Sequence, residues 1–157
     1  MRYTHFERLD LSNTVLDVAE IYQAVAEDAG QSLSCAVPEN PVEIAGDPTL
    51  LQQLLSNLIE NAVRHCPPGS TFSLALERRP DHVRLTVTDD GPGIPTDEAK
   101  KVFRRFYRVD KSRASGGHGL GLPLVKAICR LHDATIELSD AHPGLCVSIT
   151  FPHPSRG

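Results

Sequence analysis

Two neighbouring segments of this chain carry a large apolar residue at every second position, and this pattern constrains the fold more than any other feature. Apolar side chains occupy every second position over residues 72–76 and again over residues 83–87. Because successive side chains of a strand point to opposite faces, each segment predicts a strand of a sheet with one covered face. The rest of the chain must supply the layer that covers it.

Apolar residues at helical spacing predict that layer. Ser12 is suited to cap a helix that ends at Gly30, and Asp47 followed by Pro48 marks the start of a second helix. A short helix is expected over residues 96–106 and a longer one after it. The apolar stripes are Val15, Ala19, Tyr22, Val25, Ala26 and Ala29 in the first helix, Leu51, Leu54, Leu55, Leu58 and Ala62 in the second, and Leu120, Leu124, Val125, Ile128 and Leu131 in the last.

Further short strands are expected at residues 9–11, 32–37 and 42–45, the last two around a Pro-Glu-Asn-Pro turn, and at 136–138 and 147–151. Together the elements predict a two-layer α/β sandwich, in which three longer helices cover one face of a mixed, mostly antiparallel sheet. The pattern leaves the strand order open.

Composition narrows the class of protein. The 157 residues are 40 % hydrophobic and 23 % charged, which excludes a disordered, collagen-like or coiled-coil chain. No apolar run approaches the ~18 to 20 residues of a membrane helix, and the first residues lack the apolar centre of a signal peptide, so we expect a soluble fragment. The net charge of -4 argues against a general nucleic-acid binder.

One segment departs from this acidic balance. Residues 100–113 hold seven Lys or Arg and one Asp, which leaves -10 on the remainder of the chain. Such a cluster suits a local anionic partner, such as a phosphate chain or an acidic protein face. Charge alone favours the alternative, a solvated basic face.

The four cysteines, Cys35, Cys66, Cys129 and Cys146, form no C-x-x-C pair and have no histidine at zinc spacing. We interpret them as small buried thiols of a reducing compartment.

Two asparagines and an arginine share a stripe of the helix that follows Asp47. Asn57, Asn61 and Arg64 lie at i, i+4 and i+7, beside the apolar stripe. Asparagine inside a helix costs about 0.6 kcal/mol relative to alanine. The stripe is therefore either exposed or satisfied by backbone, or it binds a ligand, since an amide oxygen suits a hard cation and a guanidinium suits phosphate.

Two glycine-containing segments suit a nucleotide. Residues 89–93 (Asp-Asp-Gly-Pro-Gly) fit an ordinary turn, but their glycines also let a flat ligand approach, and Asp89 can then accept a hydrogen bond from an exocyclic amine such as that of adenine. Residues 116–122 (Gly-Gly-His-Gly-Leu-Gly-Leu) precede a helix, and their open N–H groups favour phosphate, with a flexible hinge as the alternative. This segment matches neither a P-loop nor a dinucleotide fingerprint.

In this order and spacing, the segments resemble the boxes of the catalytic, ATP-binding domain of sensor histidine kinases, in the superfamily of gyrase, chaperone, histidine-kinase and mismatch-repair ATPases (GHKL). Residues 57–65 (NLIENAVRH) resemble the N box and residues 103–108 (FRRFYR) the F box. Residues 89–94 (DDGPGI) and 116–122 resemble the two glycine boxes.

The likeness covers nearly the whole chain and implies its organisation. The catalytic domain would span residues 6–152, after a linker and first strand in residues 1–11 and before a tail in residues 153–157. The fold would be the two-layer GHKL type with a flexible ATP lid over residues 108–118.

The resemblance also implies roles for matching positions. Asn61 would bind Mg²⁺ together with phosphates and water, and Arg64 would contact phosphate. Asp89 would take the adenine amine, although Asp90 beside it leaves that choice to register. The implied nucleotide-binding residues are Asn57, Asn61, Arg64, His65, Asp89, Gly91, Gly93, Ile94, Tyr107, Arg108, Gly117, His118, Gly119, Leu120, Gly121 and Leu122; Asn57, Asn61 and Arg64 are also implied as catalytic, and Asn61 as the metal ligand.

One position bears on the reaction. ATP-hydrolysing relatives carry a general-base glutamate four residues before the magnesium-binding asparagine, where this chain has Asn57, which cannot take a proton. Glu60 lies about 100° around the helix from Asn61, and we interpret it as a surface or structural carboxylate. The resemblance thus implies transfer of the γ-phosphoryl group of Mg-ATP to a histidine nitrogen.

None of the seven histidines lies in the acceptor motif H-[DE]-x-x-[TP]: the segment His132–Thr135 is one residue short, and His5 precedes a strand. We expect the acceptor on a separate dimerisation domain absent from this chain, with relay to a response regulator. This fragment is expected to be monomeric and its parent a homodimeric inner-membrane sensor with this domain in the cytoplasm. The implied cofactors are ATP and Mg²⁺, and no nucleic acid is expected.

Two other functions stay open. The domain can be a nucleotide-gated interaction module that transfers no phosphate, or a GHKL-type ATPase or serine kinase.

Overall fold

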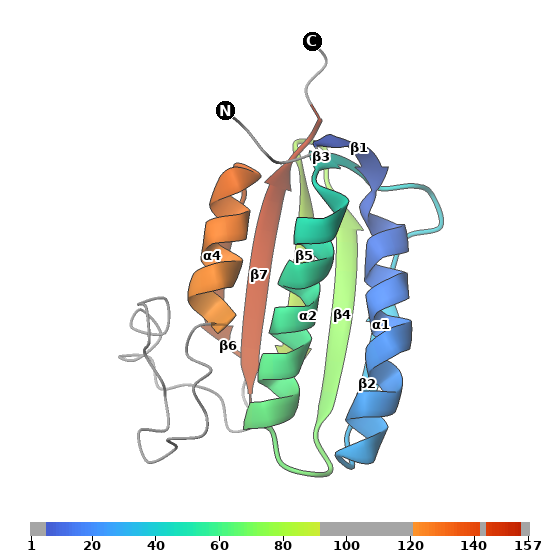
Figure 1. Ribbon diagram of the computed structural model, residues 1–157, viewed down its shortest axis with the longest axis vertical. Helices are drawn as coiled ribbons and strands as arrows, with labels where there is room; N and C mark the ends of the chain where they lie inside the picture. The colour runs from blue at the N-terminus through green and yellow to red at the C-terminus, as the bar shows by residue number, and fades with distance from the viewer. Residues whose placement is uncertain (1–5, 92–120, 142–143, 155–157) are drawn as a thin grey trace.

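The computed structural model describes residues 6–91, 121–141 and 144–154. In this part of the chain three helices cover one face of a five-stranded sheet, and a two-stranded sheet lies at one end (Figure 1). This is the predicted α/β sandwich. The helices are α1 (Leu11–Asp28), α2 (Pro48–His65) and α4 (Gly121–Leu131). The strands are β1 (Glu7–Asp10), β2 (Ser32–Ala36), β3 (Glu43–Gly46), β4 (Thr71–Arg78), β5 (His82–Asp89), β6 (Thr135–Asp140) and β7 (Leu145–Pro152).

The larger sheet has the strand order β2-β4-β5-β7-β6. β2 and β4 run parallel and every other neighbouring pair is antiparallel, so this sheet is mixed and mostly antiparallel, as predicted. β1 pairs antiparallel with β3 in the small sheet. The strands on either side of the Pro-Glu-Asn-Pro turn therefore belong to different sheets, and each differs by about a residue from its predicted bounds.

The two alternating segments form the central pair β4–β5, in which Phe72 lies opposite Asp89 and Leu76 opposite Leu85. Their alternating large apolar residues face the helix layer, and each is at most 5 % exposed. The predicted stripe of α2 covers them, and each of its five members is at most 7 % exposed. Burying one such leucine, valine or phenylalanine contributes about 1.5–3 kcal/mol, so this layer accounts for much of the core.

The start of α2 is confirmed as predicted. Asp47 Oδ1 accepts hydrogen bonds from the N–H groups of Thr49 at 3.0 Å and Leu50 at 3.3 Å, and Pro48 occupies the first turn. Because these contacts satisfy helix N–H groups that have no partner within the helix, they set where α2 begins.

The predicted cap of α1 is wrong. Asp10, not Ser12, is the N-cap: its Oδ1 accepts from the N–H of Ser12 at 3.0 Å and from the N–H of Val42 at 2.9 Å. Ser12 instead lies buried in the first turn. One carboxylate thus caps the helix and also holds the segment that enters β3.

Among the described residues of the predicted apolar stripes, three are exposed: Val25 by 42 %, Leu124 by 38 % and Leu131 by 43 %. They lie on α1 and α4, the two helices that flank α2 (Figure 1). A flanking helix packs against one neighbouring helix and the sheet, so the part of its surface that becomes buried is narrower than that of α2.

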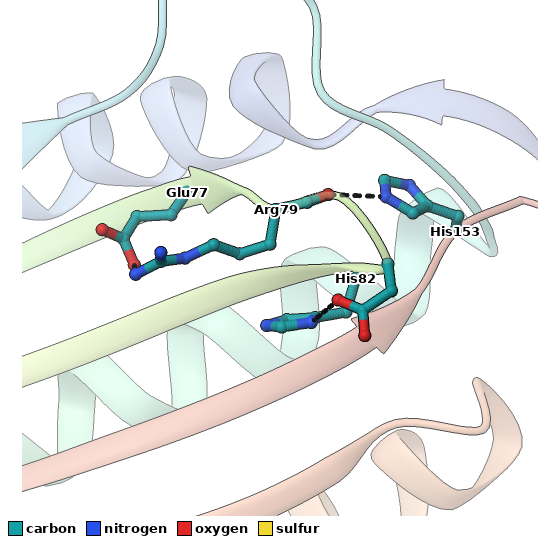
Figure 2. Close-up of polar contacts among 5 residues, drawn as sticks. Glu77, Arg79, His82 and His153 are labelled. Carbon is teal, nitrogen blue, oxygen red and sulfur yellow. Dashed lines mark hydrogen bonds and ion pairs between the residues drawn. The ribbon is translucent and has the colours of Figure 1, made fainter.

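Polar contacts close the β4–β5 turn at the end of the sheet near both termini (Figures 1 and 2). The Arg79 N–H donates to the His82 carbonyl at 2.8 Å, and His153 Nε2 donates to the Arg79 carbonyl at 2.7 Å. Arg79 also pairs with Glu77 at 3.1 Å, and His82 with Asp81 at 2.6 Å. The bond to Arg79 anchors His153, the residue that follows β7.

All four cysteines lie in the described part of the chain and are free thiols. Cys66 and Cys129 are buried, as predicted, whereas Cys35 and Cys146 are half-buried. None of the helices in the described ranges combines the length and apolar character needed to cross a membrane.

Candidate functional site

The predicted ligand-binding residues in the described part of the chain gather at one end of the sandwich. α2 and β5 both finish at the end of the sheet opposite the chain termini (Figure 1). The last turns of α2 carry Asn57, Asn61, Arg64 and His65, and β5 ends at Asp89. The fold thus places the asparagine stripe and the first glycine segment at the same end.

The polar stripe of α2 forms a contact of its own. Asn57 and Asn61 are half-buried and Arg64 is exposed, and Arg64 Nη1 donates to Asn61 Oδ1 at 3.3 Å. His65 is exposed in the last turn of the helix. The i, i+3 spacing explains why an amide and a guanidinium meet here.

Asn61 has an incompletely satisfied amide. Its Nδ2 is buried and has no hydrogen-bond partner among the described residues. Its Oδ1 makes only the long contact to an exposed guanidinium. An amide oxygen of this kind suits a hard cation that keeps water and phosphate as its other ligands, so Asn61 fits the Mg²⁺ that the resemblance implies. The described residues hold no cluster of three or more His, Cys, Asp or Glu suited to a metal.

Glu60 has a structural contact. The Tyr22 hydroxyl donates to Glu60 Oε2 at 2.5 Å and so links α1 to α2. Burial, together with this carboxylate, raises the pKa of Tyr22 above its usual value, because both disfavour the phenolate. This geometry agrees with the structural interpretation of Glu60.

The alternation of β5 decides how its last residue points. Val83, Leu85 and Val87 are buried under the helices, so Asp89 lies on the helix-covered face of the strand, whereas Asp90 follows the strand. Asp90 is exposed and its Oδ1 accepts from the Thr71 N–H at 2.8 Å.

Asp89 is half-buried and is held by backbone donors. Its Oδ1 accepts from the Gly91 N–H at 2.9 Å and from the Leu145 N–H at 3.3 Å. Both of these bonds go to Oδ1. The orientation therefore favours Asp89 over Asp90 as the carboxylate that meets a ligand beside α2.

Two residues that sequence reasoning missed complete this arrangement. Gly144 has φ of +102°, and a Cβ there would lie 1.8 Å from the Asp89 carbonyl oxygen, so only glycine lets the turn before β7 pack on the end of β5. A Cβ on Gly91 would lie 2.7 Å from Cys66 Sγ, so the residue that follows α2 also packs closely on the first glycine segment. The turn signal His-Pro-Gly before Leu145 could have pointed to Gly144; nothing local points to Cys66.

The end of α2 is also fixed by the residue that precedes β2. Gln31 is 4 % exposed, and its Nε2 donates to the carbonyls of Val63 at 3.1 Å and Cys66 at 2.7 Å. These are carbonyls of the last helical turn, which lack partners within the helix.

His132 is a packed core residue. Its Nδ1 donates to the Ile128 carbonyl at 2.8 Å, and its Nε2 accepts from the Asp47 N–H at 3.1 Å. The ring of Phe6 stacks on it at 4.6 Å, and the side chain is 3 % exposed. With both ring nitrogens engaged, His132 is not available as a phosphate acceptor.

The remaining predicted site residues are placed only in part. Gly121 begins α4, and Leu122 packs against the core. The basic cluster and the predicted lid lie outside the described residues. So do the other members of the predicted set, which are Gly93, Ile94, Tyr107, Arg108, Gly117, His118, Gly119 and Leu120.

Comparison with known proteins gives one consistent result. The sequence profile of the family described as histidine kinase-, DNA gyrase B-, and HSP90-like ATPase matches residues 46–155. The sensor-like histidine kinase SenX3 of Mycobacterium tuberculosis is 35 % identical over 156 residues, which are 98 % of this chain and 38 % of SenX3. The chain therefore spans about two fifths of that relative's length.

Solved structures agree with the sequence comparison. The mycobacterial sensor histidine kinase MprB superposes with a TM-score of 0.82 at 30 % identity, over 95 % of this chain and all of that one. The ATP-binding domain of PrrB from Mycobacterium tuberculosis superposes with a TM-score of 0.75 at 28 % identity, over 96 % of this chain and 98 % of that one.

Proposed function

Because this chain belongs to the family of histidine kinase-, DNA gyrase B- and HSP90-like ATPases, as a catalytic domain of the sensor histidine kinase type, we propose that it binds Mg-ATP and transfers the γ-phosphoryl group to a histidine of a separate dimerisation domain. The observation that carries this proposal is the position of Asp89. Two backbone N–H groups orient its carboxylate, and it lies at the same end of the fold as the Asn61–Arg64 pair of α2.

Asp89 recognises the base. With Oδ1 engaged by Gly91 and Leu145, the carboxylate directs Oδ2 to the exocyclic amine of adenine. A charged acceptor in a half-buried position makes a stronger bond than a neutral one, and it discriminates against a base with a carbonyl at that position. That the relative PrrB has an ATP-binding domain of the same fold supports this assignment.

Arg64 and Asn61 hold the phosphate end. The guanidinium supplies donors that match phosphate oxygens, and the buried Nδ2 of Asn61 gains a partner when a phosphate oxygen approaches. Bound Mg²⁺ supplies neutralisation of the charge on the phosphates. Asn61 Oδ1, which makes only a long contact with Arg64, would be the protein ligand of that ion.

Asn57 favours transfer over hydrolysis. An amide cannot take a proton from water, and Glu60 is held by the Tyr22 hydroxyl. A neutral imidazole needs no strong base, so positioning and charge neutralisation by the domain suffice. We further propose that the parent is a dimeric membrane sensor that relays phosphate to a response regulator; the relatives' names, which describe sensor histidine kinases, support the sensor role.

Incubating the chain with γ-labelled ATP, Mg²⁺ and the separately purified dimerisation domain of its parent tests the proposal. Acid-labile, base-stable label on that domain is expected, and a variant lacking its acceptor histidine should take up none. Acid-stable label would instead indicate a serine kinase, and free phosphate without labelled protein an ATPase. ATP binding with neither product would indicate a nucleotide-gated module.

A further inference from the structure

Cys66 follows the last residue of α2 and is held from both sides. Its N–H donates to the Ala62 carbonyl at 3.0 Å, and its carbonyl accepts from Gln31 Nε2 at 2.7 Å. The residue is 8 % exposed. Both backbone groups are thus fixed, and the position of the thiol depends only on one side-chain rotation.

The Cys66 thiol and the Asp89 carboxylate both lie next to the Cα of Gly91. A Cβ at Gly91 would lie 2.7 Å from Cys66 Sγ and 3.3 Å from Asp89 Oδ1. Sulfur and carboxylate therefore lie on the same side of this glycine, and the absence of a side chain there lets them approach.

We propose that Cys66 is a positioning residue for base recognition: its S–H donates to the Asp89 carboxylate and, with the two backbone N–H groups, sets the orientation in which that carboxylate meets the base. This inference rests on the proposed nucleotide-binding function.

The electrostatics of the site keep the thiol in its donor form. Burial first, then the charge of Asp89 and a hydrogen bond with its side chain, raise the pKa of Cys66 to about 12, and Asp90 adds a smaller contribution. A hydrogen bond with Ser70 acts in the opposite direction. At neutral pH the group is therefore a protonated thiol, which can donate a weak hydrogen bond.

The chemistry of sulfur suits this role. A thiol is large enough to fill the space against Gly91. The hydrogen bond that it donates is weak, so the carboxylate can still accept a strong hydrogen bond from a ligand amine. Removing the donor should leave Asp89 bound through Oδ1 but free to tilt about that oxygen.

ADP and IDP test the proposal, because they share their phosphates and differ in the amine or carbonyl of the base. Calorimetry on the wild type, Cys66→Ala, Cys66→Ser and Cys129→Ala gives the ratio of the two affinities. Cys129 is the matched control: it is a buried thiol on α4, and burial raises its pKa also to about 12.

We expect Cys66→Ala to reduce the preference for ADP by about 3- to 10-fold, chiefly through weaker ADP binding. Cys66→Ser should restore the preference, and Cys129→Ala should keep it even if it lowers the melting temperature. If Cys66→Ala does not fold, Cys66→Val retains the volume without the donor and replaces it.

An unchanged ratio in the donor-free variant would overturn the proposal. Equal losses of ADP and IDP affinity would do so too, since they would indicate a merely structural role. A wild type that binds neither nucleotide would refute the proposed function itself, which separates that failure from this one.

Discussion

Replacing Asp89 with asparagine separates the structural role of this side chain from its role in base recognition. Oδ1 accepts from the Gly91 and Leu145 N–H groups at 2.9 and 3.3 Å. Since both neighbours are donors, an asparagine turns its oxygen toward them and keeps both bonds. The free energy of unfolding should therefore change by less than about 1 kcal/mol, whereas Asp89→Ala leaves two N–H groups without this acceptor and should cost about 1–3 kcal/mol.

The same constraint determines the effect on binding. With its oxygen committed, the asparagine presents an NH₂ group to the ligand, and this donor faces the donor amine of adenine. Losing a charge-assisted hydrogen bond of about 1.5–3 kcal/mol weakens ADP binding about 10- to 150-fold. The carbonyl of IDP accepts from the new NH₂, so the variant should bind IDP at least as tightly as ADP.

Calorimetric titration with both nucleotides, beside thermal unfolding of each variant, checks this expectation. Asp90→Asn is the matched control, because that side chain is exposed and bonds to the Thr71 N–H; it should retain the preference for ADP. If Asp89→Asn keeps the wild-type preference while Asp90→Asn loses it, the reasoning from strand alternation is refuted.

Three further predictions concern the metal, the turn before β7 and the buried thiols. Asn61→Ala should abolish the effect of Mg²⁺ on ATP affinity while the melting temperature changes little; titrations in Mg²⁺ and in chelator measure this, and a persistent Mg²⁺ effect would contradict the ligand assignment. Gly144→Ala should lower the free energy of unfolding by about 1–3 kcal/mol, because Gly144 has φ of +102° and a Cβ there would meet the Asp89 carbonyl. A wild-type midpoint in urea unfolding of this variant would disprove that packing. The pKa values of Cys66 and Cys129 are raised from 9.0 to about 12, so the stability that the two thiols contribute is present below pH 9 and is lost as the pH rises toward 12. Urea unfolding should therefore show that the double alanine variant loses less stability than the wild type between pH 8 and about pH 10.5. Equal losses would argue against buried thiols.

The parts of the fold that follow from local periodicity were predictable. The alternation in β4 and β5 identified the central strands and the face that α2 covers. Asp47 and Pro48 identified the start of that helix, because capping depends on residues adjacent in sequence. Strand order could not be predicted, since it depends on contacts between distant segments.

The errors have the same origin. Asp10 and Ser12 both suit a cap, and the choice was decided by the Val42 N–H, a donor from a segment far along the chain. Val25, Leu124 and Leu131 match a helical period, but how much of that period becomes buried depends on whether a helix has neighbours on one side or both.

The candidate site divides in the same way. Helical spacing predicted that Asn61 and Arg64 share one stripe, whereas the sequence left the choice between Asp89 and Asp90 open, because it depends on the contacts that each carboxylate makes. The contributions of Cys66 and Gly144 could not be read locally, because each depends on how closely two distant backbones approach the end of β5.

Calorimetric titration of the purified chain with a non-hydrolysable ATP analogue, with and without Mg²⁺, tests the central claim most directly. The account predicts one site per chain, with affinity that increases when Mg²⁺ is present and falls in Asp89→Asn and in Asn61→Ala. Absence of binding in both conditions, or binding indifferent to both substitutions, would contradict a nucleotide site at the junction of α2 and β5.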